Sequence, residues 1–190
     1  MSLSHCCMKL ETEIKLRVKD AAEMRRRLKE AGAVHKRTAR QVDGIFDYPD
    51  SRMKKKGEVM RLRVLIPVWP DGKRVAIVTH KGKKEGNGAV KVRREDEFAT
   101  NDLKGALEEL ESMGLVKKLE YLKLTEFWKL GRVKITLDNF PQYPELGYFL
   151  ELEADLKEIE KGMKLLSLSR KDAVKETYPE MIWKIIDKKN

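Results

Sequence analysis

The sequence predicts an α+β fold in which antiparallel strands close into a barrel, with charged side chains inside and helices packed outside. Strand after strand alternates between an apolar side and a charged side, which is the period-two pattern of β-structure. The helical patterns are grouped between antiparallel strands, as in the α+β class. A sheet that closes into a barrel can enclose the charged side while helices cover the apolar side.

The elements follow in a clear order. Residues 8–18 form the first strand, in which Leu10 and Ile14 alternate with charged neighbours. A helix is expected between Asp20, which begins a capping-box-like pattern, and Gly32, a natural helix end. Further strands are predicted over residues 40–48, 58–68, 73–81, 89–98, 118–128, 132–137 and 148–154. Further helices are predicted over residues 100–114 and 155–166 and around Pro179, with a basic loop over residues 49–57.

Length and composition favour one domain that does not cross a membrane. The 190 residues are enough for a single core, so we predict one domain over residues 1–190, with a flexible tail at 1–7 and C-terminal helices in 155–190. No apolar run approaches the ~20 residues of a membrane span, and no signal peptide is recognisable. The adjacent Cys6 and Cys7 are no disulfide framework, which favours a cytoplasmic location.

The formal net charge of +10 indicates an anionic partner. Nucleic acid, polyphosphate and a nucleoside triphosphate all fit this sign. A thermophilic source, in which charged residues form surface networks, would also account for the high Lys, Arg and Glu content. The charge therefore names a class of partner and no more.

The charged strand faces provide the candidate site. The acids at spacing two are Glu11, Glu13, Glu95, Glu97, Glu151 and Glu153, and the bases are Lys15, Arg61, Arg63, Lys81 and Arg93. On a single strand, such a face is most often the solvated side of an ordinary sheet. The repetition on successive strands favours an enclosed charged interior that holds water, ions and a charged ligand.

The residue types fit phosphate chemistry. Glu11 and Glu13 would stand roughly 7 Å apart on one strand face. Paired carboxylates are oxygen donors suited to Mg²⁺ or Mn²⁺, which take their remaining ligands from phosphate and water. Arginine forks match phosphate oxygens in a two-pronged fashion. Acids on one wall and bases on the other are the layout of phosphoryl transfer.

Six short motifs follow one another along the chain. The first is Glu11-Thr12-Glu13-Ile14-Lys15, an ExExK pattern. The others are Gln41-Val42-Asp43 with Phe46-Asp47, Arg61-Leu62-Arg63, Thr79-His80-Lys81-Gly82, Arg93-Arg94-Glu95-Asp96-Glu97, and Leu137-Asp138 with residues 146–153. In this order the motifs resemble those of the CYTH superfamily of triphosphate tunnel metalloenzymes, which includes class IV adenylyl cyclases, thiamine triphosphatases and inorganic tripolyphosphatases. The resemblance covers residues 8–154.

The resemblance implies an eight-stranded antiparallel barrel whose tunnel holds a triphosphate. It assigns a metal ion, Mg²⁺ or Mn²⁺, to Glu11, Glu13, Asp138, Glu151 and Glu153, with Glu95 and Glu97 as further tunnel acids. It assigns phosphate binding to Lys15, Arg61, Arg63, Lys81, Arg93 and Lys123. Lys15 and Lys81 are the expected catalytic residues.

The sequence departs from the family pattern at two positions. The usual K-x-R pair is Lys123-Leu124-Thr125 here, so its arginine is missing, and this weakens the match to the cyclases. The tyrosine that activates water with the lysine matching Lys81 in some thiamine triphosphatases is Ile45 here. This second departure argues against that mechanism.

Three functions remain open at this stage. The first is metal-dependent hydrolysis of a triphosphate such as tripolyphosphate, ATP or thiamine triphosphate, and we favour it. The second is a class IV adenylyl cyclase that converts ATP to cyclic AMP and pyrophosphate. The third is a module that binds polyphosphate or RNA without turnover, which the patterned acids disfavour because they would repel the ligand. Nucleic acid is therefore not the expected partner, and the sequence leaves a homodimer open.

Overall fold

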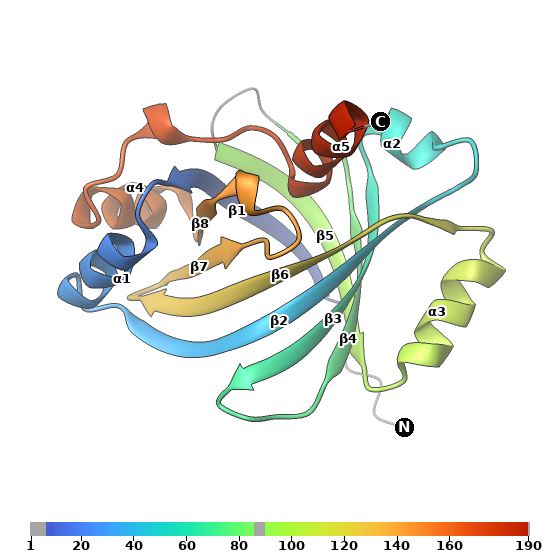
Figure 1. Ribbon diagram of the computed structural model, residues 1–190, viewed down its shortest axis with the longest axis horizontal. Coiled ribbons are helices and arrows are strands. Elements are labelled where there is room, and N and C mark those ends of the chain that lie inside the picture. The colour runs from blue at the N-terminus through green and yellow to red at the C-terminus, as the bar shows by residue number, and fades with distance from the viewer. Residues whose placement is uncertain (1–6, 86–89, 190) are drawn as a thin grey trace.

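The computed structural model describes residues 7–85 and 90–189, and it contains a closed barrel of eight antiparallel strands (Figure 1). The strands are β1 (Cys7–Val18), β2 (Val34–Asp47), β3 (Val59–Trp69), β4 (Val75–Lys81), β5 (Val90–Thr100), β6 (Val116–Leu130), β7 (Val133–Asn139) and β8 (Tyr148–Glu153). Their order around the barrel is β1-β5-β4-β3-β2-β6-β7-β8. Both the α+β class and the eight-stranded barrel expected from the sequence are confirmed.

The helices are α1 (Ala21–Glu30), α2 (Arg52–Lys56), α3 (Leu103–Ser112), α4 (Leu156–Leu165) and α5 (Tyr178–Lys189). Helix α1 begins where the sequence predicts, because the Asp20 side chain accepts hydrogen bonds from the N–H groups of Ala22 and Glu23. The expected basic loop at residues 49–57 is wrong in one respect. It contains the short α2, which ends in a left-handed Gly57 (φ 77°) and buries Met53 on the barrel. The flexible tail expected for residues 1–7 lies outside the described residues except for Cys7, which begins β1.

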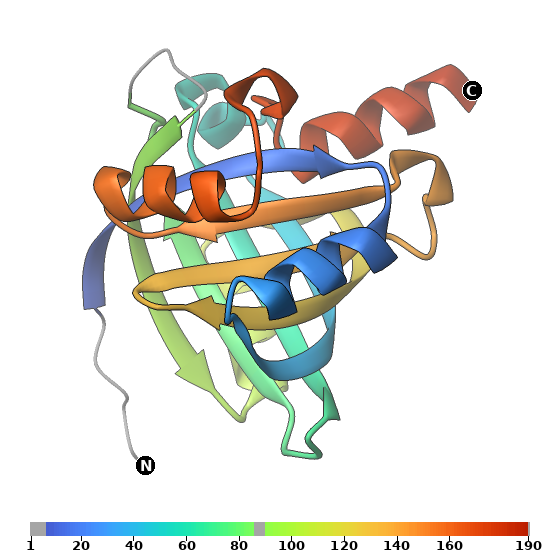
Figure 2. The ribbon, with the colours of Figure 1, turned by 90° about the vertical axis from the view of Figure 1, so that its left-hand side faces the viewer.

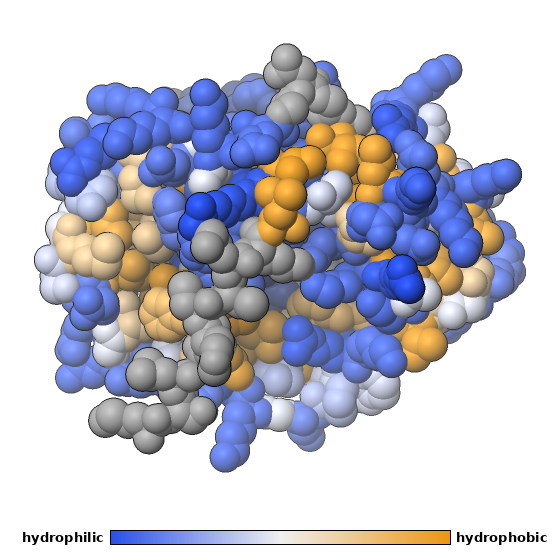
Figure 3. All heavy atoms as spheres, turned by 180° about the vertical axis from the view of Figure 1, so that it is seen from behind, coloured by the Kyte–Doolittle hydropathy of each residue, from blue (hydrophilic) through white to orange (hydrophobic). Residues whose placement is uncertain are grey.

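Alternation along each strand separates two environments. The outward side of β1, β7 and β8 forms an apolar core with α1 and α4, built around Ile14, Leu152 and Ile159 (Figure 2). Helix α3 covers β3 and β4 in a second core. The inward side carries the charged residues. The face seen in Figure 3 is mostly hydrophilic, and none of the helices in the described segments has the length and hydrophobicity of a membrane span.

Helix α5 differs from the other helices because it closes one end of the barrel. Its Tyr178, Met181 and Ile182 pack on inward-facing apolar residues of β2, β6 and β8 in a third core. The helix crosses this end of the barrel beside α2 (Figure 1). Among the described residues, no helix packs apolar side chains into the opposite end, where β2 begins and β6 ends.

The packing of α4 makes a testable prediction about stability. Ile159 is fully buried against β7 and β8, and its replacement by alanine leaves a cavity that the barrel wall cannot fill. Ile159→Ala should lower the free energy of unfolding by about 2–5 kcal/mol, measured by chemical denaturation. Lys157→Ala on the exposed side of α4 is the control, with an expected change within about 0.5 kcal/mol. Equal effects of the two changes would contradict the packing described.

Candidate functional site

The barrel encloses a cavity of about 1110 Å³ that is lined by charged side chains from all eight strands. Fifteen lysine and arginine residues and nine aspartate and glutamate residues line it, among the residues that the structure describes. This excess of positive charge suits a polyanion. Of the site residues expected from sequence, the cavity gathers Glu11, Glu13, Lys15, Arg61, Arg63, Lys81, Arg93, Glu95, Glu97, Lys123, Glu151 and Glu153.

The carboxylates collect where β1 lies between β5 and β8. Glu13 stands directly opposite Glu153, and Lys15 stands directly opposite Glu151. Like charges that face each other across a strand pair are unfavourable. Burial, a hydrogen bond with Glu95 and the charges of Glu95 and Glu153 raise the pKa of Glu11 to about 7, although Lys81 opposes them. Burial and Glu151 raise the pKa of Glu13 in the same way. The side chains around these carboxylates therefore neutralise only part of their negative charge.

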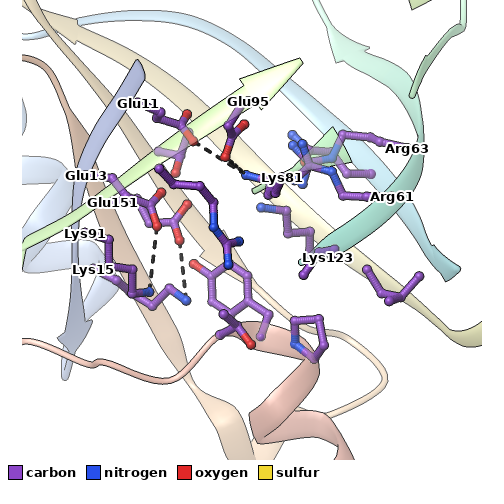
Figure 4. A pocket seen from close by; sticks show the side chains of 18 of the residues that line it. Glu11, Glu13, Lys15, Arg61, Arg63, Lys81, Lys91, Glu95, Lys123 and Glu151 are labelled. Carbon is purple, nitrogen blue, oxygen red and sulfur yellow. Dashed lines mark hydrogen bonds and ion pairs between the residues drawn. The ribbon is translucent and has the colours of Figure 1, made fainter. Parts of the chain in front are cut away.

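Ion pairs with lysines position most of these acids (Figure 4). Lys81 pairs with Glu95, and its Nζ lies 3.5 Å from Oε2 of Glu11. The Nζ of Lys91 lies 3.7 Å from Oε1 of Glu13. Burial acts to raise the pKa of Glu151, but the charges of Lys15 and other lysines bring it to about 2, so this carboxylate is ionised.

The arginines of β3 face these acids across the cavity (Figure 4). Asp43 of β2 accepts two hydrogen bonds from Arg63, at 2.6 Å from Nε and 2.8 Å from Nη2. Burial opposes ionisation of Asp43, but Arg63 holds the pKa of this carboxyl well below its usual range. The pair fixes the Arg63 guanidinium at the cavity wall.

Two guanidinium groups keep donors without acceptors. Among the described residues, the Nε atoms of Arg61 and Arg93 are buried and have no hydrogen-bond partner. Arg61 donates through Nη2 to Thr79 at 3.0 Å, and Arg93 donates through Nη2 to the carbonyl of Gly57 at 3.2 Å. Buried donors of this kind are costly unless something accepts from them. An anion in the cavity would satisfy both.

Asp138 is placed apart from the other expected metal ligands. It is fully buried, and its carboxylate accepts hydrogen bonds from Lys123 at 3.0 Å, from the Tyr178 hydroxyl at 2.9 Å and from Thr125. It is not among the residues that line the cavity. Three donors occupy this carboxylate, so the metal site that we propose below omits Asp138.

The same network shows what the two departures from the family pattern do. Thr125, in place of the arginine of the K-x-R pair, donates its hydroxyl to Asp138 and so helps to orient the acceptor of Lys123. Ile45, in place of the tyrosine, is buried in the apolar cluster under α5. That position therefore supplies packing and no hydroxyl group.

Several cavity residues were missed from the sequence. Lys91 lines the cavity beside Glu13, and its place between Val90 and Val92 on a strand could have shown this. Gln41 is 1% exposed at the cavity, and its Oε1 has no partner among the described residues. The first turn of α5, with Thr177, Tyr178 and Glu180, also reaches the cavity. The alternation along the strands could not have predicted this contact, because α5 is far from the strands in the sequence.

The fit of a divalent metal ion can be judged from the donors present. No three acidic, histidine or cysteine side chains in residues 7–85 and 90–189 converge as a preformed metal cluster. Mg²⁺ does not need one, because it is commonly held by one or two carboxylates together with waters and substrate phosphate. Glu11, Glu13 and Glu153 on adjoining strands can provide those carboxylates. The donor set therefore fits Mg²⁺ or Mn²⁺.

Comparison with known proteins agrees with this arrangement. The family model described as "CYTH domain" matches residues 9–178. The chain belongs to the CYTH family. Among curated proteins, "Putative adenylate cyclase MJ0240" of Methanocaldococcus jannaschii is 25% identical over 182 residues, which are 90% of this chain and 98% of that protein.

Solved structures of CYTH-like fold superpose on the barrel. The PH1819 protein of Pyrococcus horikoshii has a TM-score of 0.75 at 22% identity, covering 92% of this chain and 98% of that one. A Hippeastrum protein, HpAC1, has a TM-score of 0.62 at 17% identity, covering 83% of this chain and 88% of that one. It is described as an adenylyl cyclase candidate that reveals a dominant triphosphatase activity. At these identities the likeness concerns the fold.

The Asp43–Arg63 pair makes a prediction about the cavity wall. Asp43→Asn leaves the Arg63 charge without its partner, and such changes cost about 3–5 kcal/mol at buried sites. Because Arg63 faces the cavity, we expect the lower end of this range in chemical denaturation. The control Glu120→Gln breaks an exposed pair with Lys117 and should cost about 1 kcal/mol or less. A change of the same small size in both variants would show that the Asp43–Arg63 pair does not stabilise the wall.

Proposed function

We propose that this protein hydrolyses a triphosphate in a reaction that depends on Mg²⁺ or Mn²⁺. The observation that carries the proposal is that one cavity holds both the β1 carboxylates Glu11 and Glu13, whose pKa values are raised, and the buried, unpartnered Nε donors of Arg61 and Arg93. Neither set of groups is satisfied by the other side chains of the cavity. A phosphate chain with its metal ion supplies the acceptors that the arginines lack and the positive charge that the carboxylates lack.

Each residue has a role that follows from its place. Arg61, Arg63, Arg93 and Lys123 would bind phosphate oxygens through charge-assisted hydrogen bonds. Lys15 and Lys81 would hold the phosphate at the carboxylate side, since both already pair with acids there. These six contacts orient the chain for in-line attack by water and stabilise the charge that spreads over the transferring group.

Glu11, Glu13 and Glu153 are the proposed metal ligands, with Glu151 beside them as the counter-charge of Lys15. A bound Mg²⁺ or Mn²⁺ would neutralise phosphate oxygens and lower the pKa of a bound water. Glu95 and Glu97 orient the bases, because Glu95 pairs with Lys81 and Glu97 accepts from Thr79 at 2.8 Å beside Arg61. In this way the cavity can hold a triphosphate and present one end of it to water.

The open end of the cavity supports an organic substituent on the triphosphate. There the lining gains the apolar residues Leu65, Ile77 and Phe127 beside basic residues, and Cζ of Arg37 lies 4.3 Å from the centre of the Phe127 ring. Tyr121 is near the closed end, and Phe127 lies six residues further along β6, which is a separation of about 20 Å along the strand. A ring could stack on Phe127 while the phosphates occupy the charged section.

A second candidate is cyclisation of ATP to cyclic AMP and pyrophosphate. The name of the Methanocaldococcus relative points to this reaction, and the open end offers the Phe127 ring and the apolar Leu65 and Ile77 to a nucleoside. Hydrolysis is preferred because the description of the Hippeastrum protein shows that a cyclase-like barrel can be chiefly a triphosphatase. Both reactions use the same phosphate cradle and differ in the phosphorus that is attacked.

The deciding experiment incubates the protein with tripolyphosphate, ATP or thiamine triphosphate, each with Mg²⁺ or Mn²⁺, and follows the products by phosphorus NMR. Hydrolysis releases orthophosphate, whereas cyclisation releases pyrophosphate and cyclic AMP. Glu13→Gln should reduce turnover by about a hundredfold or more, because a direct metal ligand should contribute at least as much as the roughly 10–100-fold that outer-shell partners of a metal site contribute, and circular dichroism should show that the variant stays folded. Tight binding without turnover would instead favour a non-catalytic polyphosphate module.

Phe127→Ala tests the organic substituent. Stacking of a base on an aromatic ring contributes about 1–3 kcal/mol, so KM for ATP should rise about tenfold, while KM for tripolyphosphate stays the same. Phe98→Ala, which removes an exposed ring of β5 outside the cavity lining, is the matched control. Equal changes in both KM values would place the organic group elsewhere.

A further inference from the structure

The first turn of α5 forms a wall of the cavity, although it lies far along the chain from the strands that carry the charged residues. Thr177 and Glu180 fix where this helix begins. The N–H of Thr177 donates to Glu180 at 2.6 Å, and the N–H of Glu180 donates back to the Thr177 hydroxyl at 3.4 Å, which is a capping box. Tyr178, between them, is held at the first helical position.

The segment before α5 is fastened to β1 at Lys15. The N–H of Val174 donates to the carbonyl oxygen of Lys15 at 2.8 Å. In return, Nζ of Lys15 donates to the carbonyl oxygen of Glu176 at 3.0 Å. The backbone that leads into Tyr178 is therefore anchored to β1, and the Tyr178 side chain lies at the cavity.

The Tyr178 ring is enclosed on its edges and its hydroxyl is engaged. It packs on Phe140 and Phe149, with ring centres 4.8 and 5.4 Å away, and the residue is 6% exposed. Its hydroxyl donates to Asp138 at 2.9 Å. These contacts leave the ring no freedom to turn, so its face is a fixed surface.

Two lysines of the proposed phosphate site lie over the Tyr178 ring. Nζ of Lys15 is 3.7 Å from the ring centre, and Nζ of Lys123 is 5.0 Å from it. The negative face of an aromatic ring attracts ammonium groups within about 6 Å. Lys15 comes from β1 and Lys123 from β6, and their like charges would otherwise separate them. The ring, with Glu151 and Asp138, counters this repulsion.

We propose that Tyr178 is a positioning residue that orients Lys15 and Lys123 for phosphate, so that the C-terminal helix completes the binding site. Lysine is a long and flexible side chain, and fixing it before the ligand arrives lowers the entropy lost on binding. The proposal rests on the proposed function, since it concerns the lysines that would bind the triphosphate. It assigns Tyr178 no contact with substrate.

The test measures binding of tripolyphosphate in the presence of Mg²⁺ by calorimetry. Tyr178→Leu removes the ring, and the loss of orientation of two lysines should weaken binding about tenfold. Tyr178→Phe keeps the ring and loses only the hydroxyl, so it should restore affinity to within about threefold of the original. If Tyr178→Leu binds as tightly as the original chain, the proposal is overturned.

Met181→Ala is the matched control, because it weakens the packing of the same helix without touching either lysine. Its stability should fall by about as much as that of Tyr178→Leu, while its affinity for tripolyphosphate should not change. If Met181→Ala weakens binding as much as Tyr178→Leu does, then binding depends only on the packing of α5 against the barrel, and the proposed positioning role of Tyr178 is wrong.

A second readout does not depend on phosphate. The ring should shift the NMR signals of the methylene protons next to Nζ in Lys15 and Lys123 upfield, in Tyr178→Phe as well as in the original chain, and the shift should vanish in Tyr178→Leu. Absence of the shift in the original chain overturns the proposal. If the shift is present and tripolyphosphate does not bind, the proposed function fails while the arrangement of ring and lysines stands.

Discussion

The structure depends on the mutual neutralisation of acids and bases inside a closed barrel. Charged side chains are normally kept out of a protein interior because their transfer from water is costly unless they are paired. Here alternation along the strands directs them inward, and the pairs Lys15–Glu151, Lys81–Glu95 and Arg63–Asp43 compensate for burial. The outward side is thereby left apolar, and α1, α3 and α4 must cover it.

The compensation is incomplete, and the residual imbalance is what makes the cavity a site. Glu11 and Glu13 have raised pKa values beside other carboxylates, while Arg61 and Arg93 keep donors that nothing in the described part of the chain accepts. In a purely structural network, each charge would have its partner. Unsatisfied carboxylates and unsatisfied arginine donors in one cavity match a ligand that brings both a cation and a polyanion.

Much of the barrel and its lining could be predicted because both follow from local patterns. The i and i+2 spacing of Glu11 and Glu13, or of Arg61 and Arg63, survives folding unchanged because a strand keeps its two faces. The position of Asp138 could not be predicted in this way. Asp138 lies on β7, but its neighbours Lys123, Thr125 and Tyr178 come from β6 and α5, and their hydrogen bonds hold its carboxylate outside the cavity lining.

The C-terminal helix was the least predictable part for the same reason. Thr177-Tyr178-Pro179-Glu180 carries the local signature of a helix start, so its existence could be read from the chain. The position of the helix on the barrel could not be predicted. The apolar residues on which it packs, Ile45, Tyr121 and Phe149, have the same period-two pattern as any strand. These apolar residues face inward at one end of the barrel, whereas charged residues face inward along the rest of it. An apolar inward end must be covered by something apolar, and α5 covers it with Met181 and Ile182 while Tyr178 turns its ring toward the lysines. The change from charged to apolar residues along the inner faces thus determines both where the cavity ends and which side chain meets its bases there.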